Sequence, residues 1–596
     1  MDAKPPEDGS ENLIGAASVA VWLLIAGLLP AVFMPGAMSP FAPVKRDVFY
    51  LLALVQFGLV ILKQWGNPYL LARRAAVSPA ALPAALAALV TVLCLALWRE
   101  TGTGVSTLLD TAFGAGLCVV YLSEGTRRTD SKMLAVFTLS CLAAAVYGAA
   151  QYLGMDPLTW KTSFAGDAPG STFGNPLFLA DGLVGALACL LVFMTIGREW
   201  RRAAFAAGIL AWCVLLATQA RGAWLGLVLG VAPALAWYAS RYGPRGAVKR
   251  LAAFGICAVL LAAAMSLGWR GKSVPVVSHA ASVLSPFGGA FLGRFLLWES
   301  TALMIREKPV AGWGAGNLKL HYQEFQGRLL ASPRYSGLEY HTTSHSHNDF
   351  LQIFAERGAV GLGLFLWLLA CCLAFVLRGR TVRPAQAAAT LILLAWLVDS
   401  LFNGPLSLPP SSLLFWIFLA VACRRDAAEE PPGARAGAGV PGTTTVLVLY
   451  AFVLFTARPF VRDLVSESYL QSGEFARERG DTRNALIMNL KSLDLALEDR
   501  RHHFYLGQVY FARGMVKEAG EEFALDVSAN PSVATGFYNL GVARMALGGY
   551  EDALAAFKAA EAIDPNNPET KRMIREARER AEGKNSRASG AEAVVN

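Results

Sequence analysis

The stretch that decides the fold is Ser344–Val376, SHSHNDFLQIFAERGAVGLGLFLWLLACCLAFV, in which a polar cluster runs directly into a long apolar segment. The apolar part is long enough to cross a bilayer as a helix. After Asn348 come nine residues and then Gly358 and Gly361, two small residues that let another helix approach closely. Because a histidine is costly at membrane depth, His345 and His347 at the mouth of this span indicate a functional site.

The composition of the whole chain places it among membrane proteins. It has 596 residues, of which 55% are hydrophobic and 16% are charged, and its mean hydropathy is +0.42. Apolar runs of membrane-spanning length occur at thirteen places: 14–36, 46–62, 79–98, 104–123, 132–153, 173–196, 203–219, 222–240, 250–268, 350–376, 384–403, 407–423 and 442–458. The sequence therefore predicts an all-α fold, a polytopic membrane helix bundle with about 12–13 spans.

Basic residues alternate between the loops of this predicted bundle. Clusters such as Arg73-Arg74, Arg201-Arg202 and Arg424-Arg425 fall in every second loop, and the intervening short loops hold few basic residues. The positive-inside rule then places the N-terminus in the cytoplasm and both the large loop 269–349 and the C-terminal region outside. Much of the net charge of +9 is explained by this topology, so no nucleic-acid partner is expected.

The C-terminal region repeats itself with a period of 34 residues. Leu506-Gly507, Ala519, Phe523 and Pro531 recur as Leu540-Gly541, Ala553, Phe557 and Pro565. This spacing is typical of tetratricopeptide repeats, in which small residues let two antiparallel helices pack closely and the proline ends the second helix. Gly473 and Ala485 fit one period earlier, which predicts a degenerate first repeat.

The chain therefore divides into three predicted parts. Residues 1–460 form the membrane domain, with 269–349 as its large outer loop, and residues 461–582 form the tetratricopeptide domain, of which 568–582 is a polar capping helix. Residues 583–596 are expected to be a disordered tail. The nine cysteines show no CxxC spacing, so neither a zinc site nor a disulfide framework is expected.

Four polar constellations lie on the predicted outer face. The first is the loop Gly170–Pro176 with Asn175, the second is the turn Thr218–Gly222 with Arg221, the third is a helix at 291–306 that carries Arg294 and Trp298 and is followed by a glycine-rich stretch to Asn317, and the fourth is the histidine cluster. Arginine presents a fork of donors that suits phosphate oxygens. Each feature also has an ordinary interpretation, such as a loop before a helix for Asn175 or an interfacial anchor for Arg221.

Together these motifs resemble the O-antigen ligase and polymerase superfamily of bacterial membrane glycosyltransferases. The family patterns read here as Phe173–Pro176, Ala220-Arg221-Gly222, Arg294 with Trp298 and the glycine-rich stretch, and His347-Asn348 with Gly358 and Gly361. They follow the family's order, and the resemblance covers about 14–423. Many members have serine where this chain has Ala220.

The resemblance implies transfer of a glycan from an undecaprenyl-diphosphate donor to an acceptor hydroxyl at the periplasmic face of the inner membrane, with inversion and without a metal or other cofactor. It implies catalytic roles for His347, Arg221 and Arg294. Arg221 and Arg294 suit the leaving diphosphate, and His347 suits a general base. Substrate-binding roles are expected for Asn175, Asn348, His345 and Trp298.

The acceptor stays open at this stage. Lipid A-core would make the protein a ligase of lipopolysaccharide biosynthesis, a second lipid-linked glycan would make it a polymerase, and a Ser or Thr side chain would make it a protein O-oligosaccharyltransferase. A non-catalytic envelope scaffold and a transporter are alternatives from other classes. The repeats are expected to recruit a periplasmic protein.

Overall fold

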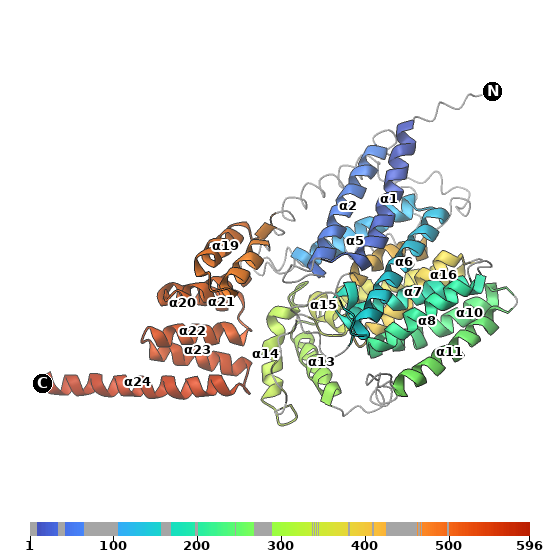
Figure 1. Ribbon diagram of the computed structural model, residues 1–596. Coiled ribbons are helices and arrows are strands. Elements are labelled where there is room, and N and C mark those ends of the chain that lie inside the picture. Colours follow the sequence, from blue (N-terminus) through green and yellow to red (C-terminus); the bar gives the residue numbers. More distant parts are fainter. Residues whose placement is uncertain are drawn as a thin grey trace.

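The computed structural model describes residues 9–33, 42–64, 105–156, 168–196, 201–267, 289–424 and 462–595, apart from interruptions of one to three residues. Within these ranges the chain is helical and contains no β-strand. Figure 1 shows a long helix bundle, a pair of helices at one end of it, and a stack of C-terminal helices beside that pair. The predicted all-α fold class is confirmed.

The protein is a multi-pass membrane protein. Within the described residues, six helices are long and apolar enough to cross a membrane: Leu13–Ala31, Arg127–Tyr152, Pro176–Thr195, Arg221–Tyr242, Ala247–Leu267 and Asp349–Arg378. Shorter apolar helices lie at Asp110–Leu122, Pro384–Asp399 and Ser411–Cys423. The spans predicted at 79–98 and 442–458 fall outside the described residues, so the count of thirteen stays a prediction.

Helix α16 (Pro384–Asp399) is at the centre of the bundle. It packs against α6 (Arg127–Tyr152), α7 (Pro176–Ile196), α17 (Ser411–Cys423) and the chain from α9 (Arg221–Leu225) through the π-helical segment η2 (Gly226–Val231) to α10 (Ala232–Tyr242). Around this core lie α1 (Gly9–Ala31), α2 (Ala42–Gln64), α5 (Val105–Glu124), α8 (Arg201–Ala217) and α11 (Ala247–Leu267). A Cβ at Gly226 would lie 2.6 Å from the carbonyl oxygen of Ala395, so glycine is what lets η2 touch α16.

A buried ion cluster closes the end of the bundle that is predicted to face the cytoplasm. The carboxylate of Asp130 accepts from Arg424 at 2.6 Å, from Arg383 at 3.1 Å and from the hydroxyl of Tyr121 at 2.9 Å. Removing one partner of such a cluster is strongly destabilising because it leaves a buried charge uncompensated. The cluster therefore fixes α6 against the ends of α16 and α17.

Helix α15 (Asp349–Arg378) is broken at Gly358, where the backbone turns to φ 65° and ψ −170°. The loop that precedes α14 (Leu318–Leu330) docks into this break. Ala359 donates to the carbonyl of Pro309 at 2.9 Å, and Gly314 donates to that of Glu356 at 2.8 Å. A Cβ on Gly358 would lie 1.9 Å from the carbonyl oxygen of Val310. Gly358 therefore serves loop docking: the atoms nearest to its missing Cβ belong to this loop and not to another helix.

Two helices of the predicted outer loop lie at the end of the bundle. Helix α13 (Gly289–Glu307) packs against α14 and against α15, and residues 291–306, predicted as one helix, are within it. Its buried residues include Leu297 and Met304, which pack with Phe325 of α14 and Ala355 of α15. This layer brings the third and fourth polar constellations together.

The C-terminal helices form antiparallel pairs, α20 (Arg500–Ala512) with α21 (Val516–Ala529) and α22 (Ala534–Ala546) with α23 (Tyr550–Ile563). A Cβ on Gly507 would lie 2.6 Å from the ring of Phe523, and one on Gly541 would lie 2.5 Å from the ring of Phe557. The glycine and the aromatic ring of each repeat therefore fit together as the tetratricopeptide pattern predicts.

The degenerate first repeat consists of residues 468–478 and α19 (Thr482–Leu495). Gly473 faces Asn489, which stands where the later repeats have phenylalanine. The last helix, α24 (Pro568–Val595), continues through residues for which a disordered tail is expected. The Arg572–Glu569 and Arg580–Glu576 pairs support its first part. The predicted boundary at 583 stays a prediction.

The repeats are attached to the outer-loop helices. Helix α23 packs on α14, where a Cβ on Gly327 would lie 2.4 Å from the carbonyl oxygen of Ile563. The side-chain amide of Asn566 donates to the carbonyl of Leu338 at 3.1 Å. In Figure 1 the stack of repeats lies beside α14 accordingly. The repeat domain thus contacts the outer loop at Leu338, a few residues before His345.

Candidate active site

The second constellation sits where the turn before α9 meets the C-terminal end of α16. Gln219 has a φ of 57°, an uncommon backbone conformation for a residue with a side chain. A Cβ on Gly222 would lie 1.9 Å from Oδ1 of Asp399 and 2.4 Å from Nδ2 of Asn403. Glycine therefore lets the turn lie directly on Asp399 and Asn403, which places Arg221 at the first position of α9.

The third constellation reaches the same place from α13. Nη2 of Arg294 donates to Oδ1 of Asn403 at 3.3 Å, and Nδ2 of Asn403 donates to Oδ1 of Asp399 at 2.7 Å. Burial and the positive charge of Arg221 lower the pKa of Arg294, and the Asp399 carboxylate opposes them. The two guanidinium groups thus lie close enough to repel each other, and an anion between them would relieve that repulsion.

The fourth constellation adds His347, which has a φ of 49°. Burial, followed by the positive charge of Arg294, lowers the pKa of His347 below its ordinary 6.5. The imidazole is therefore neutral at pH 7 and able to accept a proton. Arg221, Arg294 and His347 come from three separate segments, and the structure brings them into one electrostatic cluster, which we call the Arg–His cluster.

Hydrogen bonds of the two residues that follow His347 stabilise its left-handed backbone conformation. Oδ1 of Asn348 accepts from the backbone of Leu351 at 3.0 Å and so caps α15, while its Nδ2 donates to the carbonyl of Leu401 at 3.1 Å. The carboxylate of Asp349 accepts from Ser400 at 2.8 Å and Ser407 at 2.5 Å. The loop between α16 and α17 therefore fixes the start of α15.

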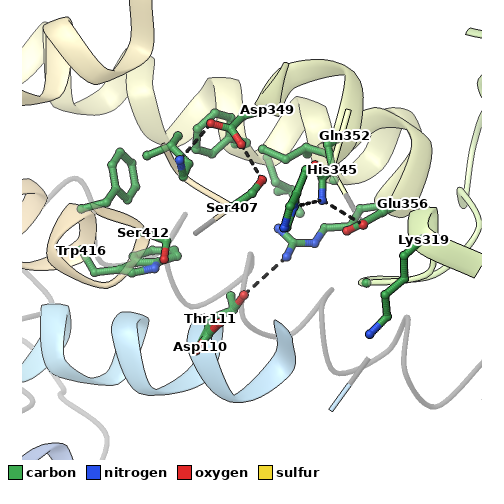
Figure 2. Close-up of a pocket in the computed structure, with 18 of the residues that line it drawn as sticks. Asp110, Thr111, Lys319, His345, Asp349, Gln352, Glu356, Ser407, Ser412 and Trp416 are labelled. Atoms are coloured by element: carbon green, nitrogen blue, oxygen red, sulfur yellow. Dashed lines mark hydrogen bonds between the residues drawn. The ribbon is translucent and has the colours of Figure 1, made fainter. Parts of the chain in front are cut away.

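His345 faces a different space from His347. Figure 2 shows its ring beside Gln352, whose Nε2 lies 3.5 Å from Nδ1 of His345 and donates to Glu356 at 3.2 Å. Burial first, and then the neighbouring His347 ring and the cations Lys319 and Arg46, lower the pKa of His345 to about 4. His345 lines a cavity of about 300 Å³ that lies between α5, α14, α15 and α17.

The remaining two predicted residues contribute packing and a helix cap. The ring of Trp298 lies 6.5 Å from that of Phe402, in the loop that follows α16. Oδ1 of Asn175 accepts from the backbone of Leu177 at 2.8 Å and so caps α7. The structure does not place Asn175 in the Arg–His cluster: its loop packs on α6 and on the end of α1, through Ser171 to the carbonyl of Ala144 at 2.6 Å and Thr172 to that of Pro30 at 2.8 Å.

Sequence reasoning did not find three residues that hold the site. Asp399 and Asn403 support Arg294 and the Arg221 turn, and Gln352 joins His345 to the backbone of Ser346 at 3.2 Å. A signal was present in the sequence, because Asp399 and Asn403 are polar residues spaced by one helical turn at the outer end of an apolar helix. Among the described residues, no group of three or more His, Cys, Asp or Glu side chains is placed to hold a metal ion.

Comparison with known proteins finds a family match within the membrane part. The O-antigen ligase family model matches residues 206–366, a range that includes the whole Arg–His cluster. No curated protein matches the chain. Among solved structures, the TPR2AB domain in the pHSP90 complex of yeast Sti1 is 14% identical and covers 50% of this chain and 100% of its own, with a TM-score of 0.19. At this TM-score the likeness adds nothing, and the tetratricopeptide assignment stands on the helix pairs described above. The chain is therefore a multi-pass membrane protein whose residues 206–366 match the O-antigen ligase family.

Proposed function

We propose that this protein transfers a glycan from an undecaprenyl-diphosphate donor to a hydroxyl group of an acceptor, with inversion at the transferred sugar. The observation that supports this most strongly is the Arg–His cluster, which gathers two cations and one neutral imidazole from three segments of the family domain. A diphosphate leaving group needs cations, and an attacking hydroxyl needs a base.

The arginines would hold the leaving group. The diphosphate carries negative charge that grows as its bond to C1 of the sugar breaks, and Arg221 and Arg294 offer charge-assisted donors to it. Because the two guanidinium groups repel each other in the free protein, an anion bound between them would relieve that repulsion. Asn403 keeps the guanidinium of Arg294 in place through the contact at 3.3 Å.

His347 would be the general base. The acceptor oxygen forms the new bond to C1, the bond from C1 to the phosphate oxygen breaks, and the proton of the acceptor moves to the imidazole. The electron pair leaves with the undecaprenyl diphosphate. Its lowered pKa keeps His347 neutral before the reaction, as a general base requires.

The location follows from the charge pattern of the sequence. We place the protein in the inner membrane, with the Arg–His cluster and the repeats on the periplasmic side. The attachment of α23 to α14 supports a common side for the repeats and the cluster. A periplasmic reporter fused after Gly473 should then be active and one fused at Ala436 inactive, and the reverse pattern would put the repeats in the cytoplasm.

The acceptor class is tested by the glycan that a deletion strain accumulates. We expect finished polymer on undecaprenyl diphosphate, as for a ligase acting on lipid A-core. Single lipid-linked repeat units would instead indicate a polymerase, and an unglycosylated periplasmic protein would indicate a protein O-oligosaccharyltransferase. An unchanged set of glycans would contradict the proposed function and favour an envelope scaffold.

A further inference from the structure

The cavity that His345 lines is separate from the Arg–His cluster and has two chemically different walls. One wall is aromatic and consists of Phe365 of α15 with Phe415 and Trp416 of α17. The other is polar and includes Asp110 of α5, Lys319 of α14 and Glu356 of α15. Figure 2 shows the side chains of Trp416 and Ser412 on one side and those of Lys319 and Glu356 on the other.

The charges of this cavity balance one another. Its three cations are Arg46, Lys319 and Arg357, and its three carboxylates are Asp110, Asp349 and Glu356. Arg46 forms an ion pair with Asp110 at 3.3 Å, and the Asp349 carboxylate is held by Ser400 and Ser407. The Arg–His cluster differs, because there two cations repel each other. A cavity with balanced charge favours an uncharged polar ligand over a diphosphate.

Two polar atoms of the cavity residues lack a partner within the described part of the chain. Nε of Arg357 and Oγ of Ser412 are buried and accept or donate no hydrogen bond there. A buried polar atom that makes no hydrogen bond costs about 1–3 kcal/mol, so a polar ligand or water must supply the missing bonds. The two atoms come from α15 and α17, on different sides of the space.

An aromatic wall opposite a wall of donors and acceptors matches the chemistry of a sugar ring. The C–H face of a sugar packs on an aromatic ring, while its hydroxyl groups need both donors and acceptors in one plane. The indole of Trp416 is fixed in position, since a Cβ on Gly114 of α5 would lie 2.2 Å from its Cδ1. A volume of about 300 Å³ is at the small end of ligand pockets and suits a short glycan segment.

We propose that this cavity is a binding subsite for an uncharged sugar ring of one of the two glycan substrates, with the ring on Trp416 and hydroxyl groups bound to Arg357 and Ser412. The inference rests on the proposed function, because only a glycan transferase brings such a sugar here. His345 lies on the cavity side of the 345–347 segment and His347 lies beside Arg294, so the segment separates the subsite from the diphosphate site.

Gln352 connects the subsite to the proposed base. Its Oε1 accepts from the backbone of Ser346 at 3.2 Å, and its Nε2 contacts both His345 and Glu356. A sugar bound against Glu356 and His345 is therefore linked, through Gln352, to the backbone of Ser346, the residue that precedes His347. Occupancy of the subsite would hold the base in position for the attacking hydroxyl.

The test uses the full-length protein in lipid nanodiscs and measures binding without transfer. The probe is the free glycan released by mild acid from the lipid-linked glycan of the same cells, observed by saturation-transfer NMR. Binding should weaken about tenfold in Trp416→Ala, equivalent to about 1.4 kcal/mol, and more moderately in Ser412→Ala, which removes only the hydroxyl. Trp367→Ala is the matched control, because Trp367 of α15 is 40% exposed and does not line the cavity.

Steady-state transfer assays of the same variants then separate the two sources of the sugar. A raised KM for the acceptor assigns the subsite to the acceptor, and a raised KM for the donor assigns it to the donor glycan. Unchanged glycan binding together with unchanged KM values for donor and acceptor in both variants, or displacement of the glycan by inorganic diphosphate, would overturn the proposal. A failure of the proposed function looks different, since His347→Ala would then transfer normally while glycan binding stayed intact.

Discussion

Gly222→Ala tests whether the contact between the Arg221 turn and α16 organises the site. The added Cβ would lie 1.9 Å from Oδ1 of Asp399 and 2.4 Å from Nδ2 of Asn403, far inside van der Waals contact. Either the turn or the end of α16 must then move by about 1 Å or more, and a shift of that size in a positioning group can cost about 100-fold in rate. Because Asn403 holds Arg294, both arginines lose their alignment.

The stability cost of the same change is moderate. Overpacking a buried site typically costs about 1–3 kcal/mol, so the variant should fold, insert and melt only somewhat below the wild type. The assay is glycan transfer by purified protein in nanodiscs, together with thermal unfolding. Gly363→Ala is the control, because a Cβ there meets no atom within 4 Å. Transfer by Gly222→Ala at a rate close to that of Gly363→Ala would refute the reasoning.

Three further predictions concern the cluster and the repeats. Arg221→Ala and Arg294→Ala should each reduce the rate of transfer at least about 10-fold, because each removes a charge-assisted contact of about 1.5–3 kcal/mol. Lys variants should restore the rate only partly, since the fork of donors is lost. Wild-type rates in both Lys variants would mean that the arginines only anchor the chain at the membrane interface. The rate of transfer should fall as the pH drops through the pKa of His347, below pH 6.5, since a protonated imidazole accepts no proton. In Arg294→Ala the residual rate should fall at a higher pH, because the charge that lowers this pKa is gone. An unchanged pH profile in Arg294→Ala would argue against His347 as the base. Deleting 466–596 should leave basal transfer to a simple acceptor but impair it in cells, and an unaffected glycan profile in cells would count against recruitment by the repeats.

The fold class could be read from the sequence because both of its signals are periodic and strong. Apolar runs predict membrane helices. The 34-residue period predicts helix pairs in which a glycine packs against an aromatic ring, as Gly507 and Gly541 do. The docking of α23 on α14 could not be predicted. This docking depends on the absence of a side chain at Gly327, where the backbone of α23 comes close. A single glycine in a helix does not indicate which segment will pack against it.

The candidate site could be read in part. Arg221, Arg294 and His347 stood out because charged or titratable residues are rare at the ends of apolar segments. Asn175 lies outside the cluster, in a loop that packs on α6 and α1, and its side chain caps α7. The sequence alone does not separate such a cap from a ligand-binding residue. The roles of Asn403 and Gln352 needed the three-dimensional structure, since their contacts join segments far apart in the chain.

The central claim, that His347 acts as the base in a glycan transfer, is tested most directly by transfer with purified His347→Ala. The protein, in nanodiscs, receives its lipid-linked glycan and its acceptor, and the product is measured beside wild type and His345→Ala. We expect His347→Ala to remain folded and to form no product, while His345→Ala keeps a measurable part of the activity. Wild-type levels of transfer by purified His347→Ala would contradict the account.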